Sequence, residues 1–144
     1  MSATRGIDGR AKAVVDFWLG VDPNDEAALE KRWLCWFRSD AAFDREIAER
    51  FGGLVADAAA GRLDAWEDTS VGRLALILLL DQFPRSLFRG TRAAFAHDDH
   101  ALALTQEGIA SGADRDLPPL ARVFFYMPLQ HAESPEVQQE SVRV

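Results

Sequence analysis

Cysteine is almost missing from this sequence. Cys35 is the only cysteine among 144 residues, so the chain cannot form an internal disulfide of the kind that stabilises small secreted domains. The residue lies within the apolar run 33–37, which is typical of a buried position. This cysteine usage favours a cytoplasmic location.

Long hydrophobic runs are missing too. The most apolar stretch is 74–80, which is only seven residues long and is closed by Arg73 and Asp81. A helix that spans a bilayer needs ~20 apolar residues. Residues 1–9 contain no apolar block followed by a small-residue cleavage site, so no signal peptide is indicated. We therefore expect a soluble protein with no membrane partner.

Positive charge is scarce as well. Lys and Arg number 16 against 23 Asp and Glu, which gives a net charge of -7. Such a chain repels a nucleic-acid backbone, so nucleic acid is not an expected partner. A nucleotide-binding glycine loop, a Gly-x-Ser-x-Gly elbow and a Cys/His nucleophile pair are also absent from the sequence. We therefore predict no cofactor.

The composition and the spacing of apolar residues predict a helical domain. Hydrophobic residues make up 48% of the chain and charged residues 27%, a balance typical of a folded core. At this length residues 1–144 are predicted to form a single domain. Apolar residues recur at helical spacing, and no segment alternates as a strand would. The prediction is an all-α fold, an array of antiparallel helical pairs joined by short turns.

The most apolar predicted helix is the central one, residues 70–83. Ser70 is its expected N-cap, and Pro84 is expected to end it because proline disfavours helical geometry in the residue before it. Other helices are predicted to begin after Asp8, at Asp22, after Asp40, near Asp99, at Pro118–Pro119 and at Ser134–Glu136.

Three features refine these helices. Leu29, Trp33, Trp36 and Phe37 form one stripe that is expected to be buried. The pair Gly52–Gly53 predicts a close helix crossing or a break. Pro128 is expected to end the helix that starts at Pro119.

The least ordinary stretch is 81–90, which places an acid, an amide and two arginines directly after the central helix. Arg85 and Arg89 are four residues apart, so on a short helix they share a face and can fork around a carboxylate or phosphate. With Gln82 they are candidate ligand-binding residues. Alternatively, Asp81 pairs with one arginine and Gln82 satisfies backbone groups, a structural lock without a ligand.

A second polar stretch, 126–133, carries a phenol, an imidazole and a carboxylate. His131 is a candidate catalytic acid or base, with Asp81 or Glu133 to orient it. Tyr126 is a further candidate ligand-binding residue. His131 equally suits a helix cap or a plain hydrogen-bond partner. The His-x-Glu spacing matches no zinc signature, so no metal site is predicted.

Two other groups favour structural interpretations. His97 and His100 could share a helical face as metal ligands, but a solvated helix start with Asp98 as its cap explains them better. The four tryptophans, Trp18, Trp33, Trp36 and Trp66, are expected in the core rather than on a base-stacking surface.

Several short motifs together resemble a known family. They are Asp16-Phe17-Trp18, Phe43-Asp44, Arg50-Phe51, Asp81-Gln82-Phe83-Pro84-Arg85, Phe88-Arg89-Gly90 and Tyr126-x-Pro-x-x-His131-x-Glu133. On these motifs, nearly the whole chain resembles the uncharacterised bacterial family called domain of unknown function 924. The resemblance implies an all-helical fold similar to tetratricopeptide-like arrays. It implies no activity, because the family has no established reaction.

The chain departs from the family pattern at three places. Ser86 stands where the family usually has asparagine, and Ala132 stands where it often has serine. Family members usually continue with a segment rich in arginine, histidine, phenylalanine and proline, whereas this sequence ends at Val144. Either the short helix predicted at Ser134–Glu136 docks its apolar face on the core, or the chain is a truncated or divergent member.

Three classes of function remain open. The first is a binding module whose groove, lined by Arg85, Arg89, Tyr126 and His131, receives a small anion or an acidic peptide terminus. The second is a hydrolase in which His131 is the general base and the arginines stabilise negative charge. The third is a protein-interaction or structural domain that assembles through an exposed apolar patch.

Overall fold

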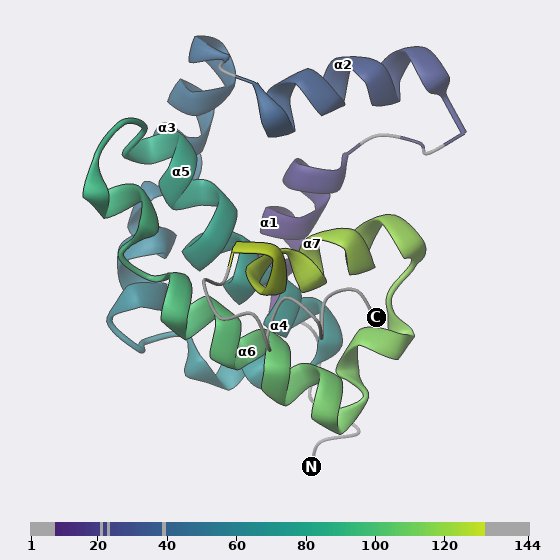
Figure 1. Cartoon of the computed structure of the whole chain (residues 1–144), viewed down its shortest axis with the longest axis vertical. Helices are drawn as coiled ribbons and strands as arrows, with labels where there is room; N and C mark the ends of the chain where they lie inside the picture. The colour runs from purple at the N-terminus through teal and green to yellow at the C-terminus, as the bar shows by residue number, and fades with distance from the viewer. Residues whose placement is uncertain (1–7, 21, 23, 39, 132–144) are drawn as a thin grey trace.

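The computed structural model describes residues 8–20, 22, 24–38 and 40–131. Regular structure in this part of the chain is helical, without any strand, which confirms the all-α prediction. The α-helices are α1 (Gly9–Leu19), α2 (Glu26–Phe37), α3 (Ala41–Ala59), α4 (Ser70–Ile77), α5 (Phe83–Leu87), α6 (Asp98–Ser111) and α7 (Pro119–His131) (Figure 1). The helix predicted at Ser134 lies outside the described residues, and the tetratricopeptide-like pairing stays a prediction.

No helix in the described ranges is long and apolar enough to cross a membrane. The central position belongs to α4, against which α1, α6 and α7 pack, while α3 packs against α5 (Figure 1). Every side chain from Leu74 to Phe83 is buried. Because each fully buried leucine or isoleucine contributes about 1.5–3 kcal/mol, this run is the main source of core stability.

The central run is not one regular α-helix. After α4, residues Leu78–Gln82 form a π-helical segment, η3, and α5 follows directly. The N–H of Phe83 donates to the carbonyl of Leu78, five residues back. Pro84 then falls in the first turn of α5, where proline is tolerated. The prediction that Pro84 ends the helix is therefore wrong, because helical structure continues to Leu87.

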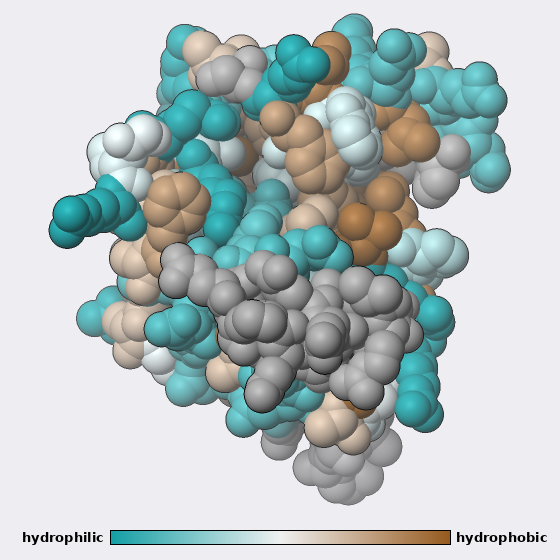
Figure 2. Space-filling model, viewed as in Figure 1, coloured by the Kyte–Doolittle hydropathy of each residue, from teal (hydrophilic) through white to brown (hydrophobic). Residues whose placement is uncertain are grey.

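The packing of α2 also differs from the prediction. Trp36 is buried, but Trp33 is 55% exposed and Phe37 44% exposed. The physical reason is position. Because α2 lies at the outer end of the molecule, neighbouring helices cover only part of its apolar stripe (Figure 1). On the same face, Figure 2 shows hydrophobic side chains gathered between α2 and α7.

Two helix starts fall on neighbours of the predicted caps. Asp25, not Asp22, caps α2, and its carboxylate accepts from the N–H of Ala28 at 3.1 Å. Thr69, not Ser70, caps α4, and its hydroxyl accepts from the N–H of Gly72 at 2.9 Å. In both cases the observed cap lies within a few residues of the predicted one, because Asp, Ser and Thr are all suitable N-cap residues.

Two predicted interruptions are absent. In α3, Gly52 and Gly53 continue the helix, and a Cβ added at either glycine would meet nothing within 4 Å. There is therefore neither a break nor a close crossing at this pair. In α7, Pro128 lies inside the helix, which runs on to His131. Phe125 and Leu129, both wholly buried, hold the chain on either side of this proline.

Candidate functional site

The candidate site is built around the carboxylate of Asp81. This residue belongs to the π-helical segment η3 and is completely buried. Its Oδ1 accepts from Nη1 of Arg85 at 3.1 Å, and its Oδ2 accepts from Nε2 of Gln82 at 2.9 Å. A buried carboxylate is stable only when donors replace the water it has lost, and these two side chains supply part of that replacement.

His131 supplies a third partner from the far end of the chain. Its Nδ1 lies 2.8 Å from Oδ1 of Asp81, and its side chain is 26% exposed. The structure therefore brings the two polar stretches that the sequence singled out into direct contact. With Nδ1 held by a carboxylate, Nε2 is the ring nitrogen that can act on another molecule.

Arg85 connects this pair to α6. Its Nη1 and Nη2 donate to Oδ1 and Oδ2 of Asp98, each at 3.1 Å, in a bidentate ion pair. The guanidinium carbon also lies 5.1 Å from the centre of the Phe95 ring. Hydrogen bonds thus link four side chains in a row, acidic and basic in turn: Asp98, Arg85, Asp81 and the imidazole of His131.

Asp98 is the site residue that sequence reasoning missed. It was predicted to be a helix cap, but the residue at the cap position of α6 is His97, and Asp98 is the first residue of the helix. Its carboxylate is used by Arg85 instead. No local signal separates the two roles, because an acidic residue at a helix start suits both.

Arg89 pairs with a different carboxylate from Arg85. Its Nε and Nη2 donate to Oδ2 and Oδ1 of Asp44 in α3, each at 3.1 Å. This ion pair joins two motifs of the family resemblance, Phe43-Asp44 and Phe88-Arg89-Gly90. The two arginines are therefore directed to carboxylates on different helices, α6 and α3.

Tyr126 points to a different part of the molecule. Its hydroxyl donates to Oδ2 of Asp114 at 2.5 Å. Burial, together with this hydrogen bond, raises the pKa of Tyr126 to about 12. Asp114 is itself buried, and its Oδ1 has no hydrogen-bond partner among the described residues.

The remaining candidates give no metal centre. No cluster of three or more His, Cys, Asp or Glu side chains within the described ranges could hold a metal ion. Glu133 lies outside those ranges. The arrangement that remains, an imidazole fixed on one side by a buried carboxylate, is the one used to prepare a histidine for proton transfer.

The fold and the site thus define an all-α protein with an Asp–Arg–His cluster, built on a buried carboxylate, between its central helix and its α6 and α7 helices. The chain belongs to the family of bacterial proteins of unknown function DUF924, whose model matches residues 14–144. No curated protein matches it.

A solved structure supports the same assignment. The protein of unknown function ATU0120 from Agrobacterium tumefaciens is 40% identical, and the match has a TM-score of 0.79. It covers 91% of this chain and 69% of that one. The family resemblance carried by the short motifs is therefore confirmed, and neither comparison names an activity.

Proposed function

We propose that this protein is a hydrolase-type enzyme in which His131 is the catalytic acid–base group. The observation that carries the proposal is the 2.8 Å contact between Nδ1 of His131 and Oδ1 of the fully buried Asp81. An exposed histidine paired with a surface carboxylate would be ordinary. A partly exposed histidine oriented by a wholly buried carboxylate needs a reason to keep that charge inside the protein.

The chemistry follows from the hydrogen bond. With its proton on Nδ1 donated to Asp81, neutral His131 presents an unprotonated Nε2. This nitrogen removes a proton from a water molecule as the water attacks a substrate bond, and later returns the proton to the leaving group. The imidazolium that forms in between lies against the Asp81 carboxylate, so its positive charge is balanced where it arises.

Arg85 and Gln82 act through Asp81 rather than on substrate. Both Nη atoms of Arg85 are engaged by carboxylates, and Gln82 donates to Asp81 Oδ2. They are positioning residues, which hold Asp81 in the orientation that His131 requires. For the same reason the binding-module hypothesis has less support: Arg85, Arg89 and Tyr126 already have partners within the protein.

The test is a hydrolysis screen with nitrophenyl carboxylic and phosphoric esters, comparing the unmodified protein with His131→Gln. General acid–base catalysis contributes about 10²–10⁴-fold, so the variant is expected to lose at least 10²-fold in kcat on any ester that is cleaved. His97→Gln and His100→Gln are matched controls, because they remove the other two histidines of the chain. Cleavage that survives in His131→Gln, or that falls equally in all three variants, would contradict the proposal.

A second measurement does not need a substrate. Nitrogen NMR of the histidine side chains is expected to show the His131 proton on Nδ1 in the unmodified protein. Asp81→Asn should change that tautomer balance, while Gln82→Ala should preserve the tautomer. A His131 ring protonated on Nε2 in the native protein would leave no base for the reaction.

We also infer a cytoplasmic location and a small-molecule substrate rather than nucleic acid. The inference rests on the single cysteine and the net charge of -7. Fractionation of cells that express the tagged protein would check the location.

A further inference from the structure

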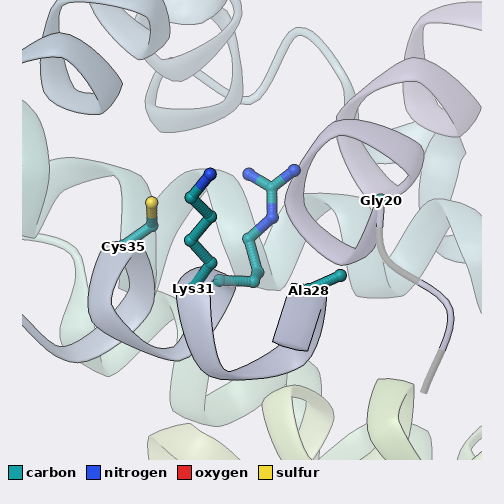
Figure 3. A pocket seen from close by; sticks show the side chains of 5 residues that line it. Gly20, Ala28, Lys31 and Cys35 are labelled. Atoms are coloured by element: carbon teal, nitrogen blue, oxygen red, sulfur yellow. The ribbon is translucent and has the colours of Figure 1, made fainter. Parts of the chain in front are cut away.

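A pocket between α1 and α2 lies apart from the Asp81 cluster. It has a volume of about 330 Å³ and is lined by Gly20, Ala28, Lys31, Arg32 and Cys35. Figure 3 shows the Lys31 and Cys35 side chains rising from α2 on the same side, into the space beside the end of α1. The end of α1 at Gly20 forms the opposite wall.

The two cations of this pocket have no carboxylate within ion-pair distance in the described part of the chain. Several other arginines each pair with an aspartate or glutamate, namely Arg10, Arg50, Arg62, Arg85 and Arg89. Lys31 and Arg32 form no such ion pair with a described residue, although acidic residues outnumber basic ones by 23 to 16. Two neighbouring cations without a carboxylate repel each other, and an anion between them would remove that repulsion.

Arg32 is held in place by aromatic rings instead. Its guanidinium carbon lies 5.4 Å from the centre of the Phe43 ring and 6.0 Å from that of Phe17. A guanidinium that rests on rings is less hydrated, and its edge N–H groups remain available to an oxygen ligand. The side chain is thus oriented before any ligand arrives, which lowers the entropy lost on binding.

Gly20 keeps the pocket open on the α1 side. A Cβ at this position would lie 2.6 Å from the carbonyl oxygen of Asp16 and 3.6 Å from Nη2 of Arg32. The Asp16 carbonyl oxygen thus leaves no room for a side chain at this position, and the space beside the guanidinium stays free on the α1 side.

Cys35 completes the wall without adding charge. Burial, followed by the field of Asp40, raises the pKa of the Cys35 thiol, so the sulfur stays neutral at physiological pH. Asp40 is the nearby negative group, and its oxygens are engaged by the N–H of Phe43 at 2.9 Å and by Sγ of Cys35 at 3.9 Å. Asp40 therefore also caps the start of α3.

We propose that this pocket binds a doubly charged tetrahedral oxyanion, a phosphate group or its equivalent, through Lys31 and Arg32. The ammonium supplies a compact charge and the guanidinium supplies a directed fork of donors, a combination that suits phosphate oxygens. The site uses none of the atoms of the Asp81–His131 pair, so a test of phosphate binding is independent of the test of the hydrolase proposal.

Cys35 offers a direct reporter of occupancy, because it is the only cysteine in the chain and lines the pocket. The experiment measures the rate at which the neutral reagent N-ethylmaleimide alkylates Cys35 while inorganic phosphate is titrated at constant ionic strength. At a phosphate concentration about ten times its Kd, occupancy predicts alkylation roughly tenfold slower. The apparent Tm should rise over the same concentration range.

The double variant Lys31→Gln with Arg32→Gln is expected to lose both effects. Lys31→Gln alone leaves the aromatic contacts of Arg32 intact and should weaken protection without disturbing the fold. Arg62→Gln with Arg92→Gln is the matched control, since it removes two positive charges elsewhere and should retain protection. Alkylation that phosphate does not slow, or slows equally in both double variants, would overturn the proposal.

Discussion

Among single residues, the Asp81 carboxylate depends most on hydrogen bonds from its neighbours. It is fully buried and takes donors from Arg85, Gln82 and His131. Leaving a buried charge without its partner costs about 3–5 kcal/mol, whereas an exposed ion pair contributes about 1 kcal/mol or less. Arg85 is therefore worth more to stability than Arg89, although each forms a bidentate pair with an aspartate.

Tyr126 gives a pH-dependent prediction at the same scale. Its pKa is raised to about 12 in the folded protein, against about 10 for an ordinary tyrosine. The folded state therefore holds this proton more tightly than the unfolded chain does. The stabilisation is fully present below pH ~10 and is lost as the pH rises toward 12.

Ultraviolet absorbance of the phenolate measures this directly, because Tyr126 is the only tyrosine in the chain. Rapid mixing into alkaline buffer, read before unfolding, should give a midpoint near 12 for the native protein. Asp114→Asn keeps an oxygen acceptor but removes its charge, so it should lower the midpoint. A native midpoint close to that of free tyrosine would show that the Asp114 contact does not form.

The polar residues show what a sequence can and cannot indicate. Asp81, Arg85 and His131 were identified from residue type and from their position at helix ends. Asp98 was missed, and the different carboxylate partners of Arg85 and Arg89 were not foreseen, because the partner of an arginine depends on distances across the fold. A charge pattern reveals which groups need partners, but only tertiary packing decides the pairing.

For whole elements, local chemistry was the better guide. The starts of α1 and α3 follow from Asp8 and Asp40, whose side chains cap the free N–H groups of their own helices. The exposed stripe of α2 could not be predicted in this way. Amphipathic spacing shows which face of a helix is apolar, but not how much of that face its neighbours cover.

Gly53 in α3 and Gly72 in α4 give two predictions of opposite sign for the free energy of unfolding. Gly53 lies in a helix where an added Cβ meets nothing within 4 Å, so Gly53→Ala should raise the free energy of unfolding by about 0.5–1 kcal/mol. At Gly72 a Cβ would lie 2.2 Å from the carbonyl oxygen of Trp66. Gly72→Ala should therefore lower the free energy of unfolding, by about 1–3 kcal/mol.

Urea unfolding followed by tryptophan fluorescence would compare the two variants, with an unchanged m-value as the sign that only stability has moved. A loss of stability in Gly53→Ala would mean that α3 meets a neighbour at this position. An unchanged Gly72→Ala would mean that the close approach to Trp66 can relax freely.

The whole molecule has an uneven distribution of stability. The central run from Leu74 to Phe83 is buried throughout, whereas α2 buries only Trp36. Segments with few buried contacts open locally, while core segments open only when the protein unfolds. The amides of α2 should therefore exchange with solvent much faster than those of α4.

Native-state hydrogen exchange in increasing urea tests this ordering. Exchange of the α4 amides should depend on urea as steeply as global unfolding does, and exchange of the α2 amides should depend on it weakly. Equal urea dependence for both helices would mean that α2 unfolds together with the core. In the expected case, phosphate bound at Lys31 and Arg32 should slow exchange in α2 and leave α4 unchanged.

The π-helical turn at Leu78–Gln82 sets the angular phase between the two halves of the central run. An α-helix advances about 100° per residue, and a π-turn closes on one residue more than an α-turn, so winding the same residues as regular α-helix would rotate everything after them by about that angle. The apolar composition of the run would not change, yet Arg85 would turn away from Asp98. A single residue of length, rather than any one side chain, thus keeps the buried acid aligned with its arginine and its histidine.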